Sequence, residues 1–142
     1  MKLVKLFLVI LPLIMLFSLT ACSAGIPISI EIPYDDFIED QHFDWTANVD
    51  YGDTVVITLG SNPTTGFTWP DIVQIGDQEI LKQVSHEFIP PEQTGTVGSS
   101  GKDKWTFKTL NKGTTSIVME YSQPWDGGEK ATWTFRALIT VK

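Results

Sequence analysis

The sequence predicts an all-β domain, either a sandwich or a barrel, and three observations carry that prediction. Apolar and polar residues alternate along several short runs, as the two faces of a half-buried strand require. Gly, Pro and Asn separate these runs at short spacing, which is typical of all-β folds. No window of useful length shows the 3.6-residue period of an amphipathic helix. Aromatic residues make up 11% of the chain, enough to fill such a core without disulfides.

Four runs within residues 54–141 show the alternation most clearly. Each is rich in β-branched and aromatic residues, which fit a pleated, half-buried surface. Residues 111–113, Asn-Lys-Gly, separate the second run from the third and predict a hairpin turn. The side chains expected to face the core are Val55, Ile57 and Leu59, then Trp105 and Phe107, then Ile117, Met119 and Tyr121, and finally Trp133, Phe135, Ala137, Ile139 and Val141.

The N-terminal residues have the pattern of an export signal followed by a lipidation site. Lys2 and Lys5 precede an unbroken apolar run over residues 6–17, as in a secretory signal. At about 1.5 Å per residue, a helix of this length is too short to cross a hydrocarbon core of ~30 Å. Residues 19–22, Leu-Thr-Ala-Cys, then resemble a lipobox, in which cleavage precedes a cysteine that becomes lipid-modified. An ordinary signal peptide with a chance cysteine at Cys22 is the alternative.

This prediction sets the expected domain organisation and location. Residues 1–21 are expected to be a lipoprotein signal peptide and residues 22–40 a lipidated tether, with an edge strand as the alternative. Residues 41–142 form a single domain, expected to be monomeric. Acyl chains on Cys22 would anchor the protein to a membrane. It would lie on the outer side of the cytoplasmic membrane, or in the periplasm or outer membrane.

Charge and cysteine content narrow the expected partners. Cys22 is the only cysteine, so the exported domain is expected to hold together by its core alone. Loss of Lys2 and Lys5 with the signal would take the formal net charge from −7 to −9. Such an acidic chain argues against nucleic acid as a partner, because phosphates require a basic surface.

The segment that follows the first predicted strand is built to be stiff. Pro63 restricts its own backbone and that of Asn62, and Gly66 permits a positive φ. Asn62, Thr64 and Thr65 can bond to the local backbone. A stiff loop loses little conformational entropy on docking, which suits a binding element. The same composition is also compatible with an ordinary turn.

Two further segments are unusual connections between strands. Residues 89–102 are long and rich in small residues, a composition compatible with function or with disorder. Residues 122–130 place Trp125 in a turn rich in Pro and Gly. This tryptophan either belongs to an interface or caps one end of the domain.

These three segments together resemble the chagasin-like inhibitors of cysteine peptidases. Residues 62–67 read Asn-Pro-Thr-Thr-Gly-Phe, which matches the N-P-T-T-G-[YF] signature of that family. Residues 98–101 resemble its G-x-G-G loop and residues 123–125 its R-P-[WF] motif. The resemblance covers roughly residues 49–141. Ser100 stands where the family usually has Gly, and Gln123 where it usually has Arg.

The resemblance implies an immunoglobulin-like antiparallel β-sandwich with three binding loops at one end. The loops would enter the active-site cleft of a papain-like cysteine peptidase and inhibit it reversibly, without covalent chemistry. Residues 62–67 would lie nearest the catalytic thiol, residues 98–101 along the non-primed subsites, and Pro124 and Trp125 on the primed side. The implied peptidase-binding residues are Asn62, Pro63, Thr64, Thr65, Gly66, Phe67, Gly98, Ser99, Ser100, Gly101, Gln123, Pro124 and Trp125.

An enzyme is not expected. The only thiol, on Cys22, is expected to be lipidated, and His42 and His86 share no catalytic or metal-binding motif. The acidic stretch at residues 34–40 lacks the ligand spacing and central Gly of a calcium loop, so no metal or cofactor is expected. The alternative function is an immunoglobulin-like lipoprotein module for adhesion or envelope assembly. Such a module would share the fold but would not be expected to carry the three motifs in this order.

Overall fold

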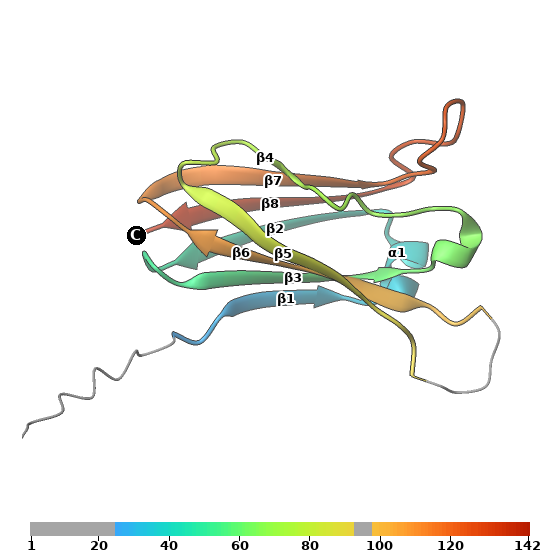
Figure 1. The fold of residues 1–142 in the computed structure, drawn as a ribbon, viewed down its shortest axis with the longest axis horizontal. Helices are drawn as coiled ribbons and strands as arrows, with labels where there is room; N and C mark the ends of the chain where they lie inside the picture. Colours follow the sequence, from blue (N-terminus) through green and yellow to red (C-terminus); the bar gives the residue numbers. More distant parts are fainter. Residues whose placement is uncertain (1–24, 93–97) are drawn as a thin grey trace, which may run out of the picture.

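The computed structural model describes residues 25–92 and 98–142 as a sandwich of two four-stranded sheets (Figure 1). The elements are β1 (Ile28–Ile32), α1 (Tyr34–Glu39), β2 (His42–Val49), β3 (Thr54–Ser61), the 3-10 turn η1 (Pro63–Thr65), β4 (Gln74–Ile75), β5 (Leu81–Ile89), β6 (Gly101–Thr109), β7 (Gly113–Tyr121) and β8 (Trp133–Val141). One sheet has the order β1-β3-β6-β5 and the other β2-β8-β7-β4. Neither α1 nor η1 is long and apolar enough to cross a membrane, and these are the helical segments described.

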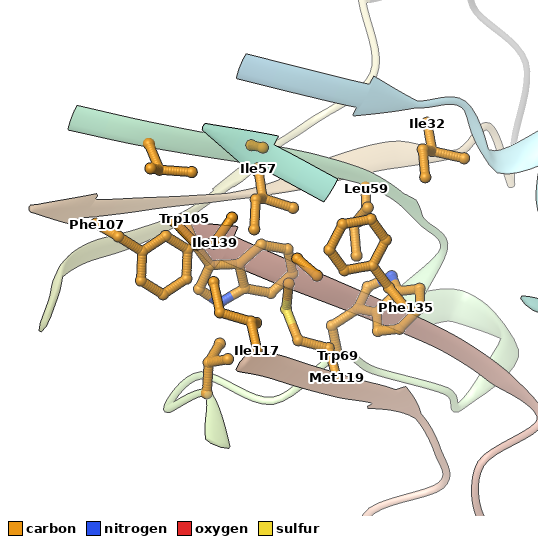
Figure 2. Close-up of a cluster of buried hydrophobic side chains, with 14 of the residues drawn as sticks. Ile32, Ile57, Leu59, Trp69, Trp105, Phe107, Ile117, Met119, Phe135 and Ile139 are labelled. Atoms are coloured by element: carbon orange, nitrogen blue, oxygen red, sulfur yellow. The ribbon is translucent and has the colours of Figure 1, made fainter. Parts of the chain in front are cut away.

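The alternation predicted from the sequence is confirmed in β3, β6, β7 and β8. Every side chain expected to face the core in these strands is at most 8% exposed. Figure 2 shows Trp105, Phe107 and Phe135 packed between the two sheets, with Met119 filling the space beside them. Each sheet contributes one apolar face to this core, as in other face-to-face sandwiches.

The hairpin predicted at residues 111–113 is wrong. β6 and β7 belong to different sheets, so this turn carries the chain from one sheet to the other. Gly113 has a φ of 144°, outside the range that other residues readily adopt. Alternation shows that a strand buries one face, and strands of either sheet satisfy that condition. The local pattern therefore cannot distinguish a hairpin from a crossing between sheets.

The sheets are mixed rather than wholly antiparallel. β1 pairs with β3, and β2 pairs with β8, in parallel register. The remaining strand pairs are antiparallel. Both β1 and β2 are edge strands, the position at which mixed sheets commonly carry an odd strand.

Residues 28–39 pack against the sandwich, within the segment that the sequence analysis treats as a tether. β1 is an edge strand, and α1 buries Phe37 completely. The Phe37 ring lies against the rings of Phe43, Trp69 and Trp133, with centroids 4.8, 5.2 and 5.2 Å away. The carboxylate side chains of α1 are exposed. A helix of one and a half turns is too short to produce a periodic sequence pattern. Cys22 and the predicted signal lie outside the described residues.

Three connections meet at one end of the sandwich: β3 to β4 through η1, β5 to β6, and β7 to β8 (Figure 1). The start of β1 and the end of β8 lie at the opposite end. Below, the first loop is residues 62–67, the second loop is residues 90–92 and 98–100, the described parts of its connection, and the third loop is residues 122–132.

Candidate functional site

The first loop is organised around the side chain of Asn62. The side-chain oxygen of Asn62 accepts hydrogen bonds from the backbone N–H of Thr64 at 3.3 Å and from the Thr64 hydroxyl at 2.6 Å. The side-chain nitrogen donates to the carbonyl oxygen of Gly98 in the second loop at 2.9 Å. The backbone carbonyl of Asn62 accepts from the Thr65 hydroxyl at 2.7 Å. The local bonding predicted for these three residues is therefore confirmed, and it makes the loop one closed turn.

Aromatic rings of the core lie directly beneath the first loop. Phe67 stacks on Tyr121 with ring centroids 5.7 Å apart, and the Tyr121 hydroxyl accepts a hydrogen bond from Asn62 N at 2.9 Å. Trp69 is buried, and its indole nitrogen donates to the carbonyl oxygen of Gly60 at 3.0 Å. The first loop is thus fixed to the core at both of its ends.

α1 supports the first loop from the N-terminal side. A Cβ on Gly60 would lie 2.1 Å from Tyr34 N and 2.3 Å from Tyr34 Cα, so only glycine fits where the helix crosses β3. Burial raises the pKa of the Tyr34 hydroxyl, and the neighbouring Tyr121 and Asp35 raise it further. A hydrogen bond with the Thr65 side chain acts in the opposite direction. Through that bond α1 contacts a residue predicted to bind the peptidase.

Gly98 in the second loop and Gly101, the first residue of β6, are glycines for different reasons. Gly98 has a φ of 87°, a conformation that favours glycine. A Cβ on Gly101 would lie 2.5 Å from the carbonyl oxygen of Ile89, so the neighbouring strand leaves no room for a side chain. Ala131 is the only non-glycine residue with a positive φ in the described part of the chain. Ser100 therefore replaces glycine without backbone strain.

The third loop is closed at its base by polar contacts of its own. Gln123 N donates to the carbonyl oxygen of Glu129 at 2.8 Å, and Glu129 N donates to the side-chain oxygen of Gln123 at 2.9 Å. The ammonium of Lys130 donates to the backbone carbonyls of Gln123 and Trp125. A Cβ on Gly128 would lie 2.9 Å from the indole nitrogen of Trp125, so glycine is needed for the ring to lie there.

The three loops form one continuous surface. The bond from Asn62 to Gly98 joins the first loop to the second. Thr68, just after the first loop, exchanges backbone hydrogen bonds of 2.9 and 3.1 Å with Ser122 at the start of the third. A Cβ on Gly66 would lie 2.9 Å from the Trp125 ring, which places that ring against the first loop. The first loop therefore lies between the other two.

The predicted binding residues divide into a presented group and a supporting group. The exposed members are Pro63, Thr64, Thr65, Gly98, Pro124 and Trp125. Gly66, Phe67, Ser99, Ser100 and Gln123 are half-buried, while Asn62 and Gly101 are buried. The sequence analysis missed the residues that hold the surface in place, namely Tyr34, Gly60, Tyr121, Gly128 and Lys130. Most of them act through contacts between residues far apart in the sequence, which no local pattern reveals. Lys130 is the exception, because a lysine inside the third loop can be recognised in the sequence as a candidate loop contact.

Among residues 25–92 and 98–142, no group of three or more His, Cys, Asp or Glu side chains is placed to hold a metal ion. His86 contacts two carboxylates, with Nε2 2.7 Å from Asp103 and Nδ1 3.3 Å from Asp71, and its ring stacks on Trp105. These contacts tie β5 and β6 to the segment that follows Trp69. What the site offers is a preformed surface for binding.

Comparison with known protein families agrees with the loop geometry. The model of the chagasin family of peptidase inhibitors, I42, matches residues 48–139. The chain belongs to this family. The match begins inside β2, so β1 and α1 lie outside it.

Similar proteins include known members of the family. Amoebiasin-2 of Entamoeba histolytica is 33% identical over 85 residues, which is 60% of this chain and 68% of the relative. Chagasin of Trypanosoma cruzi is 31% identical over 84 residues, 58% of this chain and 76% of the relative. The crystal structure of the cysteine protease inhibitor EhICP2 from Entamoeba histolytica shares the fold with a TM-score of 0.62 at 22% identity, covering 82% of this chain and 97% of that one.

Proposed function

We propose that this chagasin-family protein inhibits papain-like cysteine peptidases reversibly and without covalent chemistry, by inserting its three loops into the active-site cleft. The observation that carries the proposal is the convergence of residues 62–67, 98–101 and 123–125 on one continuous surface. The family is one of peptidase inhibitors, and EhICP2, which has the same fold, is described as a cysteine protease inhibitor. One copy carries all three loops, so a monomer suffices.

The loops have the physical properties of a tight, reversible plug. A closed turn fills a cleft without presenting an extended scissile bond, so the peptidase has no segment to cut. The turn is already formed by its own hydrogen bonds, which keeps the entropic cost of docking small. Thr64 and Thr65 are exposed at the tip, and Trp125 is 50% exposed. A large, rigid aromatic side chain in that position is typical of an interface hot spot.

The test is a titration of a papain-like peptidase with residues 23–142, following cleavage of a small peptide substrate. We expect competitive, reversible inhibition that weakens about tenfold or more in the double variant Thr64→Ala with Thr65→Ala. The control is Thr114→Ala with Thr140→Ala, which removes two hydrogen-bonded threonine hydroxyls from the opposite end of the sandwich. Absence of inhibition by a folded domain, across several papain-like enzymes, would instead favour the adhesion or envelope-assembly module.

We also propose that Cys22 is lipidated and holds the domain on the outer side of a membrane. The sequence pattern supports this, as does the position of Gly25, where a Cβ would meet the side chain of Asp53 at the end opposite the loops. An anchor three residues earlier would leave the loops facing away from the membrane. Metabolic labelling with a fatty-acid analogue should mark the full chain in the membrane fraction and should not mark Cys22→Ser. An unlabelled or released wild-type chain would contradict the anchor.

A further inference from the structure

The third loop contains a cation that the family motif does not place there. The part of the third loop that follows β7 is called its first stem, and the part that leads into β8 its second stem. Lys130 lies on the second stem, and its ammonium donates to the carbonyl of Trp125 at 2.9 Å and to the carbonyl of Gln123. Both acceptors belong to the 123–125 motif on the first stem. Gln123 and Lys130 also line one groove of about 360 Å³ beside the loop. A positive charge from one stem is therefore fixed on the backbone of the other.

Lys130 forms no ion pair in the described structure, although the exposed carboxylates of Asp126 and Glu129 belong to the same loop. Both of its acceptors are neutral carbonyl oxygens. The residue is exposed, and the chain as a whole has a formal net charge of −7. Lys130 is thus a positive centre at the loop-bearing end of an acidic protein, and its field extends toward a docked partner.

Gln123 has a different task from the arginine that usually begins this motif. Its side-chain oxygen accepts a hydrogen bond from Glu129 N at 2.9 Å, and its backbone N–H donates to the carbonyl of the same residue. These contacts close the loop but leave no cation on the first stem. An ammonium has three donors, and two of those of Lys130 are used within the loop. One donor remains for a partner.

We propose that Lys130 replaces the missing arginine from the opposite stem of the loop. It positions the 123–125 turn so that Trp125 is presented, and it supplies the positive charge for a carboxylate on the target peptidase beside its cleft. Lys130 is in this sense a positioning residue that also affects target choice. The inference rests on the proposed inhibitory function, which supplies the partner.

The experiment compares four variants by inhibition of a papain-like peptidase at low and high ionic strength. Lys130→Met should weaken inhibition about tenfold at low salt, and by less at high salt, because exposed charges are screened. Adding Gln123→Arg to Lys130→Met should recover only the salt-dependent part of the lost affinity, because it returns the charge to the family position but cannot accept the hydrogen bond from Glu129 N. Lys130→Arg should retain the affinity. Lys112→Met removes another exposed lysine, from the turn between β6 and β7, and should have no effect.

A second readout tests the positioning role without a peptidase. The NMR resonance of the Trp125 indole N–H should shift in Lys130→Met, which removes both donors, and stay near the wild-type value in Lys130→Arg, which keeps them. Unchanged inhibition together with an unchanged resonance in Lys130→Met would overturn the inference. If the wild-type protein does not inhibit, the proposed function fails, and the resonance still decides the positioning role. If Trp125→Ala weakens inhibition but Lys130→Met does not, the result excludes only the proposed contribution of the Lys130 charge to peptidase binding.

Discussion

The first and third loops lie side by side, but they are held in place by different means. The first loop is fixed to the core, because Asn62 is buried and Phe67 stacks on Tyr121. The third loop is closed mainly by bonds within itself, and Trp125 is 50% exposed. Changes in the first loop should therefore alter both stability and inhibition. Changes at the tip of the third loop should alter inhibition alone, so binding and folding can be separated there.

Asn62→Ala should have the largest effect, because it breaks the attachment of the first loop. It removes the hydrogen bonds to Thr64 and Gly98, and we expect the free energy of unfolding to fall by about 2–3 kcal/mol. Inhibition should weaken by about tenfold or more at the same time. Urea unfolding and the inhibition assay measure the two effects. Asn48→Ala, an exposed asparagine in β2, is the control and should change neither. Full inhibition by Asn62→Ala would show that the attachment is dispensable.

Gly60→Ala should destabilise the protein through α1. The new Cβ would collide with the backbone of Tyr34, so the helix must move, at a cost of about 1–3 kcal/mol in the free energy of unfolding. Gly127→Ala is the comparison, because Gly127 has a φ of 77° with no atom within 4 Å and should lose only about 1 kcal/mol. Thermal and urea unfolding rank the two variants. Equal losses would mean that α1 does not brace β3.

Trp125→Ala should separate binding from folding. Half of the ring is exposed, so the free energy of unfolding should stay within about 0.5 kcal/mol of the wild-type value. Inhibition should nevertheless weaken about tenfold or more, as for an interface hot spot. Tyr51→Ala is the matched control, because Tyr51 is 60% exposed in the turn between β2 and β3 at the opposite end. Equal inhibition by both variants would remove the third loop from the interface.

Tyr34→Phe should have the smallest effect, visible mainly at alkaline pH. Burial raises the pKa of the folded-state hydroxyl above 10.0, so its contribution to stability is complete below about pH 10. That contribution is lost as the pH rises through the folded-state pKa. As the pH rises above about 10, the wild-type protein should therefore lose stability faster than the variant, which has no hydroxyl to ionise. Urea unfolding above and below this pH measures the difference, and parallel curves would contradict the packing of the half-buried Tyr34 against the core.

The strands and the motif residues could be predicted from the sequence, whereas their three-dimensional connections could not. Val55 and Phe135 are buried as alternation predicts, because a strand with one apolar face has one stable orientation. The same rule does not say which sheet a strand joins, so the turn before Gly113 was assigned incorrectly. The supporting contacts of Tyr34 and Tyr121 join residues far apart in the chain, and no local pattern records them. Those contacts decide which motif residues are exposed and which support the loops.

Protection of the catalytic thiol of a papain-like peptidase tests the central claim most directly. The peptidase is treated with a small thiol-alkylating reagent, alone and with saturating amounts of residues 23–142, and the alkylation rate is followed by mass spectrometry. If the three loops fill the cleft, alkylation should slow by about the fraction of enzyme bound. The Trp125→Ala variant should protect the catalytic thiol only at a higher concentration of the inhibitor domain. A bound protein that leaves the alkylation rate unchanged would contradict insertion into the active-site cleft.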